Sequence, residues 1–393
     1  MEIALKVIFI LTFAALALGD LGRIQFENGI AITTYDTAVG LLVLTWLAHR
    51  LMQKKKERIS AVFLKPILVF AGVGLISLVF NFRFLTLSDF TVSFLYLVRW
   101  VFYAGIYFVV SDFDPRFKKK IPLIMIFVSF FLVVIPGYIQ YFLYPNLRNL
   151  YYLGWDEHLY RLVSTFLDPN FTAVASTLLL MLILAMRLGK IGWIVAGLTF
   201  IALLLTYSRS GYLMFFVSAT TLLFLLGKSR YAILLLLVFA FGIFLLPKNL
   251  EGEGVKLLRT ASIFNRLEST GNAIAIFKDN PLIGVGFNAY RYAQYRYGFI
   301  KGENWKIVHS GAGTDNSFLL VLATTGIIGF MSYLYLWWVI LKKTYSQRIS
   351  NAISVAVLAS IIGLAVNSFF LNSLFFPFVM AWMWVLIGLR ESK

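Results

Sequence analysis

The chain has 393 residues, of which 60% are hydrophobic and only 13% are charged, and its formal net charge is +17. A mean hydropathy of +0.83 excludes a soluble globular domain of this length, and the continuous apolar runs exclude a transmembrane β-barrel, whose strands alternate. The absence of cysteine excludes thiol catalysis, disulfides and thiolate metal sites. The positive charge is better explained by cytoplasmic loops than by nucleic-acid binding. The composition therefore predicts an all-α polytopic membrane protein.

Twelve apolar runs are long enough, at about 17–25 residues, to cross a bilayer as helices. They lie at residues 3–19, 33–49, 60–80, 90–111, 121–144, 169–187, 190–206, 210–227, 231–247, 317–341, 351–370 and 374–390. The first run is interpreted as a span rather than a cleavable signal peptide, because no convincing small-residue cleavage site follows it. Pro66 and Pro136 are expected to kink the third and fifth helices.

Lysine and arginine are concentrated in every second connection, as expected of cytoplasmic loops. Both termini are therefore expected on the cytoplasmic side. Three regions follow: spans one to nine in residues 1–247, a large extracytoplasmic loop in residues 248–316, and spans ten to twelve in residues 317–393. The short cytoplasmic loops have no room for a nucleotide-binding domain and contain no P-loop. Chemistry is therefore expected in the large loop, with energy supplied by the substrate itself.

Arg209 is a candidate anion ligand at the outer membrane surface, in LLTYSRSGYLM, where the eighth helix begins. Ser208 or Ser210 can cap that helix. A guanidinium at a helix N-terminus suits phosphate, since it forms bidentate bonds and the helix end adds partial positive charge. The alternative interpretation is an interfacial anchor.

Two more arginines and an aspartate lie in or near the spans. Arg99, inside the fourth span, should face a polar cavity or an anion. The alternatives are that it snorkels to the membrane surface or forms a structural pair with an Asp of another helix. Arg161 precedes the run FLDPN, in which Asp168 and Pro169 are typical of a helix cap and first turn. Capping alone is sufficient to explain Asp168.

The large loop carries three further signals. Residues 266–277 have apolar positions at helical spacing, and a glycine turn at residues 282–288 follows as a weak phosphate signal. Residues 290–297 interleave four tyrosines, which can stack on sugars, with Arg291 and Arg296, which can hold acidic groups; the alternative is an interfacial amphipathic helix. Near the end of the loop, glycines surround His309 and Asp315, which suggests that both groups approach a substrate.

Several of these runs together resemble the O-antigen ligase and O-antigen polymerase superfamily. They are TYSRSGYL, RLESTGNAIAIFKDNPLIGVGFNAY, GTDNSFLLVLATTGIIGF and FLDPNFTAVAST, and they cover roughly residues 160–335. The resemblance implies a metal-independent, membrane-embedded glycosyltransferase of the GT-C-like type, without a cofactor. Its members transfer undecaprenyl-pyrophosphate-linked glycans on the outer side of the bacterial cytoplasmic membrane, to lipid A core, to another glycan or to a protein.

The resemblance also implies roles for residues. Arg209 and Arg266 would bind the pyrophosphate leaving group, and one-step attack would invert the anomeric carbon. Ligases of the family often carry a His-Asn pair at the entry of the span after the loop, where this chain has Asp315-Asn316. This departure argues against an ordinary ligase and favours a polymerase or a divergent member of the family. Either Asp315 or His309 could then deprotonate the acceptor hydroxyl.

We therefore expect a polymerase of lipid-linked oligosaccharide repeat units, with a ligase as the close variant. The substrate-binding candidates are Arg209, Arg266, Arg161, Arg99, Arg291 and Asn316, and the catalytic candidates are Asp315 and His309. Expected partners are the lipid-linked glycan, a glycan or lipid acceptor, membrane lipids and a regulator of chain length, but no nucleic acid. A flippase for lipid-linked sugars would spread charges through several spans, whereas this chain has chiefly Arg99 there. A peptidoglycan polymerase of the rod-shape and division type is also less well supported, because SRSG and NPLIGVGF point elsewhere.

Overall fold

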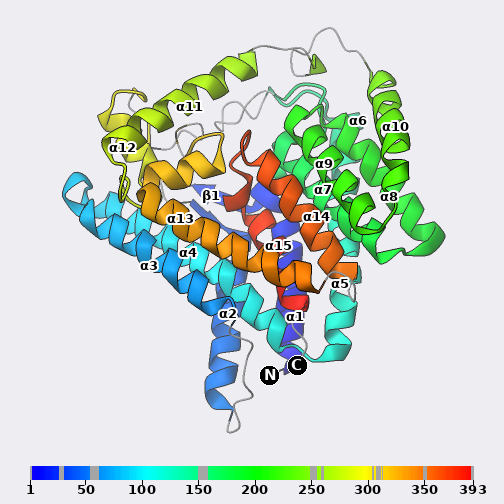
Figure 1. Ribbon diagram of the computed structural model, residues 1–393, viewed down its shortest axis with the longest axis horizontal. Coiled ribbons are helices and arrows are strands. Elements are labelled where there is room, and N and C mark those ends of the chain that lie inside the picture. Colours follow the sequence, from blue (N-terminus) through cyan, green and yellow to red (C-terminus); the bar gives the residue numbers. More distant parts are fainter. Residues whose placement is uncertain are drawn as a thin grey trace.

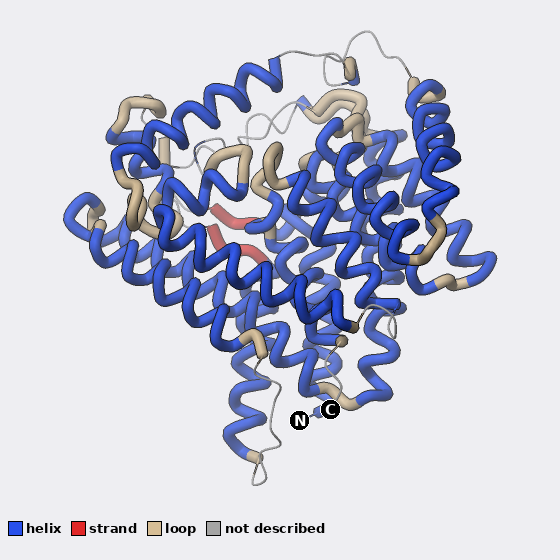
Figure 2. The backbone as a smooth tube through the Cα atoms, in the orientation of Figure 1, coloured by secondary structure: helices blue, strands red, loops and turns tan. Residues whose placement is uncertain are grey.

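The protein is a bundle of helices with one small hairpin, as a computed structural model shows (Figure 1). The structure describes residues 2–25, 31–53, 62–148, 158–247, 255–257, 261–302, 305–306, 311, 313–347 and 352–390. Helices dominate these residues, and the two short strands lie near the middle of the molecule (Figure 2).

A helical segment coincides with each predicted apolar run. These segments are α1 (Glu2–Ala17), α2 (Thr34–Met52), α3 (Leu64–Phe80), α4 (Leu87–Asp112), α5 (Pro115–Ser129) with α6 (Ile135–Leu143), α7 (Pro169–Met186), α8 (Gly189–Leu205), α9 (Arg209–Leu225), α10 (Ala232–Phe244), α13 (Ser317–Ser346), α14 (Ala352–Asn367) and α15 (Pro377–Leu389). Among the described residues, four segments are long and apolar enough to cross a membrane: Leu87–Asp112, Pro115–Leu143, Pro169–Met186 and Ser317–Ser346. The structure thus confirms the all-α membrane class, whereas the count of twelve spans and the GT-C-like architecture remain predictions.

The described part of the large loop contains two helices, α11 (Ala261–Asp279) and α12 (Tyr290–Arg296), and α11 agrees with the helical spacing of residues 266–277. In Figure 1 they lie at the end of the bundle opposite to the start of α1. An antiparallel hairpin of β1 (Arg23–Gln25) and β2 (Ala31–Thr33) joins α1 to α2 and was not predicted. In the view of Figure 1 the hairpin appears below α11 and α12, near the middle of the bundle.

The two prolines behave differently. Pro66 lies in the first turn of α3, where its missing N–H has no intrahelical role, so α3 runs uninterrupted to Phe80 and the predicted kink was wrong. Pro136 follows a π-helical turn at Phe130–Val134, which separates α5 from α6. The fifth segment is therefore interrupted where it was expected to be.

The glycine turn of the large loop docks into a break in α13. The break is at Gly326, whose φ of 64° and ψ of −169° lie in a region that essentially only glycine adopts. Backbone hydrogen bonds cross the break in both directions: Val285 N–H to Ala323 O (3.0 Å), Gly286 N–H to Thr324 O (2.9 Å), Ile327 N–H to Pro281 O (2.8 Å) and Ile328 N–H to Leu282 O (3.3 Å). The loop and the two halves of α13 therefore satisfy one another's backbone groups.

The end of α3 completes this junction. The hydroxyl of Ser77 lies 2.5 Å from the carbonyl oxygen of Ile283 and 2.8 Å from that of Thr324. The carboxamide of Asn81 donates to the carbonyl of Gly284 at 2.9 Å. Because the N–H groups of the turn are consumed by protein carbonyls, its glycines serve close packing rather than a phosphate cradle.

Candidate functional site

The N-termini of α7 and α9 lie side by side. Ser208 is the N-cap of α9 and accepts the N–H of Gly211 at 3.3 Å, and its hydroxyl donates to Asn170 Oδ1 at 2.8 Å. Asp168 is the N-cap of α7, accepting the N–H groups of Asn170 at 2.6 Å and Phe171 at 3.3 Å. The capping roles read from the sequence are therefore confirmed for Ser208 and Asp168.

Two further helices begin at the same place. Phe171, in the first turn of α7, stacks on Phe376 at the start of α15, with ring centroids 3.9 Å apart. Ser317, the first residue of α13, donates its N–H to Ser368 O at 2.9 Å and accepts the N–H of Leu374 at 3.2 Å. Four helix N-termini thus converge, and each contributes partial positive charge that favours an anion.

Arg209 lies at the first position of α9, within this group of helix ends. Its side chain is half-buried, and Nη1 donates to the carbonyl oxygen of Leu257 at 3.3 Å. Val255 and Leu257 pack against the main core of the bundle. The large loop therefore contacts Arg209 through the backbone of Leu257.

Arg266, on α11, belongs to the same electrostatic neighbourhood. Burial lowers the pKa of its guanidinium; the charge of Asp315 opposes this shift, that of Arg209 adds to it, and that of Asp168 opposes it. α11 is tied to the start of α13 through Ser269, whose hydroxyl donates to Thr314 Oγ1 at 3.1 Å and accepts the N–H of Asp315 at 3.3 Å. The structure therefore places Arg266 within electrostatic range of Arg209 and Asp315, although these residues are far apart in the sequence.

The other residues predicted beside Asp315 are placed as follows. Asn316 is the N-cap of α13, and its Oδ1 accepts the N–H groups of Phe318 at 2.9 Å and Leu319 at 3.0 Å. The side-chain oxygen of Asn316 is therefore already bonded to two N–H groups in the first turn of α13. Asp315 is exposed. His309 lies outside the described residues.

Arg161 supports the α8–α9 turn from below. It is buried, with Nε donating to Thr206 O at 2.8 Å and Nη2 lying 3.5 Å from Tyr207 O. The backbone of Leu162 donates to Leu205 O at 2.9 Å. This geometry gives Arg161 a positioning task next to Arg209, since it fixes the turn from which α9 starts.

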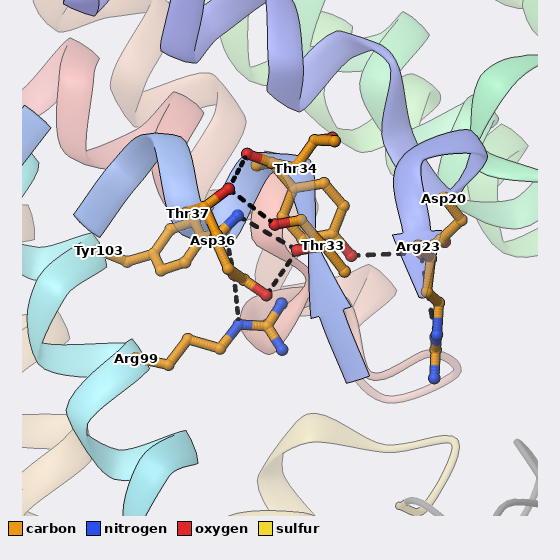
Figure 3. Close-up of polar contacts among 9 residues, drawn as sticks. Asp20, Arg23, Thr33, Thr34, Asp36, Thr37, Arg99 and Tyr103 are labelled. Atoms are coloured by element: carbon orange, nitrogen blue, oxygen red, sulfur yellow. Dashed lines mark hydrogen bonds and ion pairs between the residues drawn. The ribbon is translucent and has the colours of Figure 1, made fainter. Parts of the chain in front are cut away.

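Arg99 forms the structural pair that the sequence left open. Its Nε lies 2.8 Å from Asp36 Oδ1 on α2, and the same oxygen accepts the hydroxyl of Tyr103 at 2.8 Å. Thr33 donates to the other oxygen, Oδ2, at 2.7 Å. Figure 3 shows Arg99 beside Asp36, and Arg23 beside Asp20, around the hairpin. This arrangement fixes α2 against α4.

Arg291, on α12, lies within electrostatic range of Arg23 of the hairpin. Desolvation lowers the pKa of the Arg291 guanidinium. Tyr96 and Tyr292 oppose this shift, whereas the charge of Arg23 adds to it. The predicted arginines therefore form two sets, one at the converging helix ends and one near β1. Burial raises the pKa of Asp20, the charge of Arg23 lowers it, and the charge of Asp168 raises it. Asp168 therefore lies within electrostatic range of Asp20, beside the hairpin, and of Arg266, at the helix ends.

Two more polar groups lie near Asp315: Tyr290, which the sequence offered only as one of four tyrosines that can stack on sugars, and Asn372, which it did not single out. The hydroxyl of Tyr290 is fully buried without a hydrogen-bond partner, and burial and the charge of Asp315 raise its pKa. Oδ1 of Asn372, in the α14–α15 turn, is also unpartnered, and a Cβ at Gly313 would lie 3.4 Å from Nδ2 of the same amide. Buried polar groups without partners are unusual, so both are further candidates for contact with a substrate. Nothing in the local sequence distinguishes Asn372 from a turn residue.

Comparison with known proteins bears on this site. Residues 194–334 match the family model described as O-antigen ligase. This segment is similar to the O-antigen ligase family. The match runs from α8 into α13 and so contains Arg209, Arg266 and Asp315, whereas the FLDPN run lies outside it. No curated protein matches the chain at a significant level. The match confirms the resemblance to the O-antigen ligase and polymerase superfamily, which implies a membrane enzyme that acts on a lipid-linked glycan and an acceptor.

Proposed function

We propose that the protein polymerises undecaprenyl-pyrophosphate-linked oligosaccharide repeat units on the outer face of the bacterial cytoplasmic membrane. The observation that carries the proposal is the approach of Arg209 and Arg266, both within the segment that matches the O-antigen ligase family, to the N-termini of α7, α9, α13 and α15. A departing diphosphate is highly charged, and guanidinium groups and helix ends that are already oriented stabilise such charge in the transition state.

The reaction balances as a single displacement. An acceptor sugar oxygen forms a bond to the anomeric carbon of the donor while the bond from that carbon to the diphosphate oxygen breaks. The diphosphate leaves with the electron pair on its oxygen, held by Arg209 and Arg266. The hydroxyl proton passes to Asp315 or His309. Attack opposite the leaving group inverts the anomeric configuration.

Two observations bear on the alternatives. Asp315-Asn316, in place of the His-Asn pair common in ligases, supports a polymerase, with a ligase as the second candidate. Arg99 is paired with Asp36, which leaves the flippase interpretation without its chief charged residue inside a span. The direct test supplies the purified protein with an undecaprenyl-pyrophosphate oligosaccharide and no nucleotide. A ladder of products supports a polymerase, transfer only to lipid A core or protein supports a ligase, and no transfer to any acceptor contradicts the proposal.

Asp315→Asn is expected to lower the turnover number by about 10²- to 10⁴-fold if Asp315 is the general base. The substitution keeps the size of the side chain and removes its capacity to take a proton. The measurement is the pH dependence of transfer at saturating donor, with His309→Asn as the paired variant. If Asp315→Asn retains wild-type rates and the acidic limb of the profile, while His309→Asn loses both, the base is His309 instead.

A further inference from the structure

Two tyrosines of α12 and Trp305 form a stacked aromatic surface on the large loop. Tyr295 and Trp305 lie face to face, with ring centroids 4.1 Å apart and planes within 8°. Tyr292 meets Trp305 edge-on at 6.1 Å. Tyr295 is 48% exposed, whereas Tyr292 is 8% exposed. We call these three residues the aromatic ledge; its open side is the ring of Tyr295, backed by Trp305.

The ledge is held in place by an ion pair to the membrane bundle. Nζ of Lys306 lies 2.9 Å from Oδ1 of Asp89, a buried residue in the first turn of α4. The same ammonium group lies 5.3 Å from the centre of the Trp305 ring. On the opposite flank, Gln294 donates to the carbonyl of Gly311 at 3.0 Å. A ligand that stacks here would not have to order these side chains, which lowers the entropic cost of binding.

The position of the ledge indicates what it binds. Gln294, the residue before Tyr295, donates to the carbonyl of Gly311, and Gly311 lies in the segment that leads directly to Asp315. A glycan whose reacting end lies at Asp315 would therefore reach the ledge with a sugar a short distance along its chain. Pyranose rings present flat faces of C–H groups, which pack well on exposed aromatic rings.

We propose that the aromatic ledge binds pyranose rings of the glycan chain outside the transfer centre and keeps the chain attached between successive transfers. The inference rests on the proposed function, because the chain it holds is the one being transferred. It adds a second glycan-binding site, with product length as the property that the site controls. A lone interfacial tyrosine would serve only to anchor the loop in the headgroup region.

The test measures binding and product length separately. The probe for binding is the oligosaccharide released by mild acid from the cell's own polyprenyl-pyrophosphate pool, titrated into detergent-solubilised protein by calorimetry. We expect Trp305→Ala and Tyr295→Ala to weaken binding at least about fivefold, as loss of an aromatic stacking partner does. In the transfer assay, we expect shorter products at a rate of single transfer within about twofold of wild type.

The matched control is Tyr144→Ala, which removes a tyrosine that is 67% exposed at the end of α6. Tyr295→Phe keeps the aromatic ring and should bind the oligosaccharide as the wild type does. Together with Tyr295→Ala, it tests the ledge even if Trp305→Ala proves misfolded. Unchanged binding and unchanged product length in Tyr295→Ala, or no binding by the wild type, overturn the ledge. Ledge-dependent binding in a protein that transfers no glycan would sustain the ledge and reject the proposed function, whereas normal transfer with no ledge dependence would do the reverse.

Discussion

Arg209→Gln and Arg266→Gln are each expected to reduce glycan transfer by about 10²- to 10³-fold, the usual cost of removing one preorganised donor to a developing anion. The two guanidinium groups come from different elements, α9 and α11, and Arg266 lies within electrostatic range of Arg209, Asp315 and Asp168. In the proposed function, a diphosphate bound between the two arginines would relieve their mutual repulsion. Lysine at either position should recover only part of the rate, because it keeps the charge and loses the bidentate fork.

The measurement is the rate of single transfer from an undecaprenyl-pyrophosphate donor, with folding followed by thermal unfolding in detergent. Arg83→Gln is the matched control, since Arg83 is an exposed arginine in the α3–α4 turn whose guanidinium packs on Phe84. We expect the control to keep the wild-type rate and all three variants to keep the melting temperature. Near-normal transfer by both Arg209→Gln and Arg266→Gln would remove the leaving-group role from these residues.

The sequence was most informative where structure is determined locally. Apolar length alone located the helical segments, and the caps at Ser208 and Asp168 could be read because a cap bonds to N–H groups two or three residues away. The family resemblance, and not any periodicity, connected Arg209 with Arg266. The N-terminus of α13 was read as an active-site entry, and its Asn316 is also a helix cap. An asparagine at position 316 is compatible both with substrate binding and with helix capping.

Tertiary contacts account for what the sequence did not predict. Arg161 and Arg99 were both plausible anion ligands, yet the structure directs the first to backbone carbonyls and pairs the second with Asp36. Which partner a buried arginine meets depends on helix packing, and no local pattern encodes it. Asn372 was missed for the same reason, because its proximity to Gly313 results from the docking of the α14–α15 turn.

The glycine turn at residues 282–288 is a further case in which tertiary contacts decide the role. Its motif suggested phosphate binding, whereas in the structure its backbone bonds to the break in α13 at Gly326. Gly326→Ala is expected to destabilise the folded protein by about 2–6 kcal/mol, combining backbone strain with overpacking. A Cβ at Gly326 would lie only 2.2 Å from the carbonyl oxygen of Leu282, and one at Gly284 only 2.4 Å from the carbonyl carbon of Thr324. Both obstacles are backbone atoms, so no side-chain rotation can relieve them.

Gly72→Ala separates this effect from the general loss of a glycine. Gly72 lies within α3, the helix that also supplies Ser77 to the junction, and a Cβ there would meet open space, so alanine should stabilise the helix by about 0.5–1 kcal/mol. The measurement is the thermal midpoint and the yield of monodisperse protein in detergent. Because the junction fixes the large loop against α13, and α11 reaches Asp315 from that loop, Gly326→Ala should also lower transfer in whatever fraction remains folded. Equal stability of Gly326→Ala and Gly72→Ala would mean that α13 can run unbroken through this point, and the loop would then have to be positioned over Arg209 by other contacts.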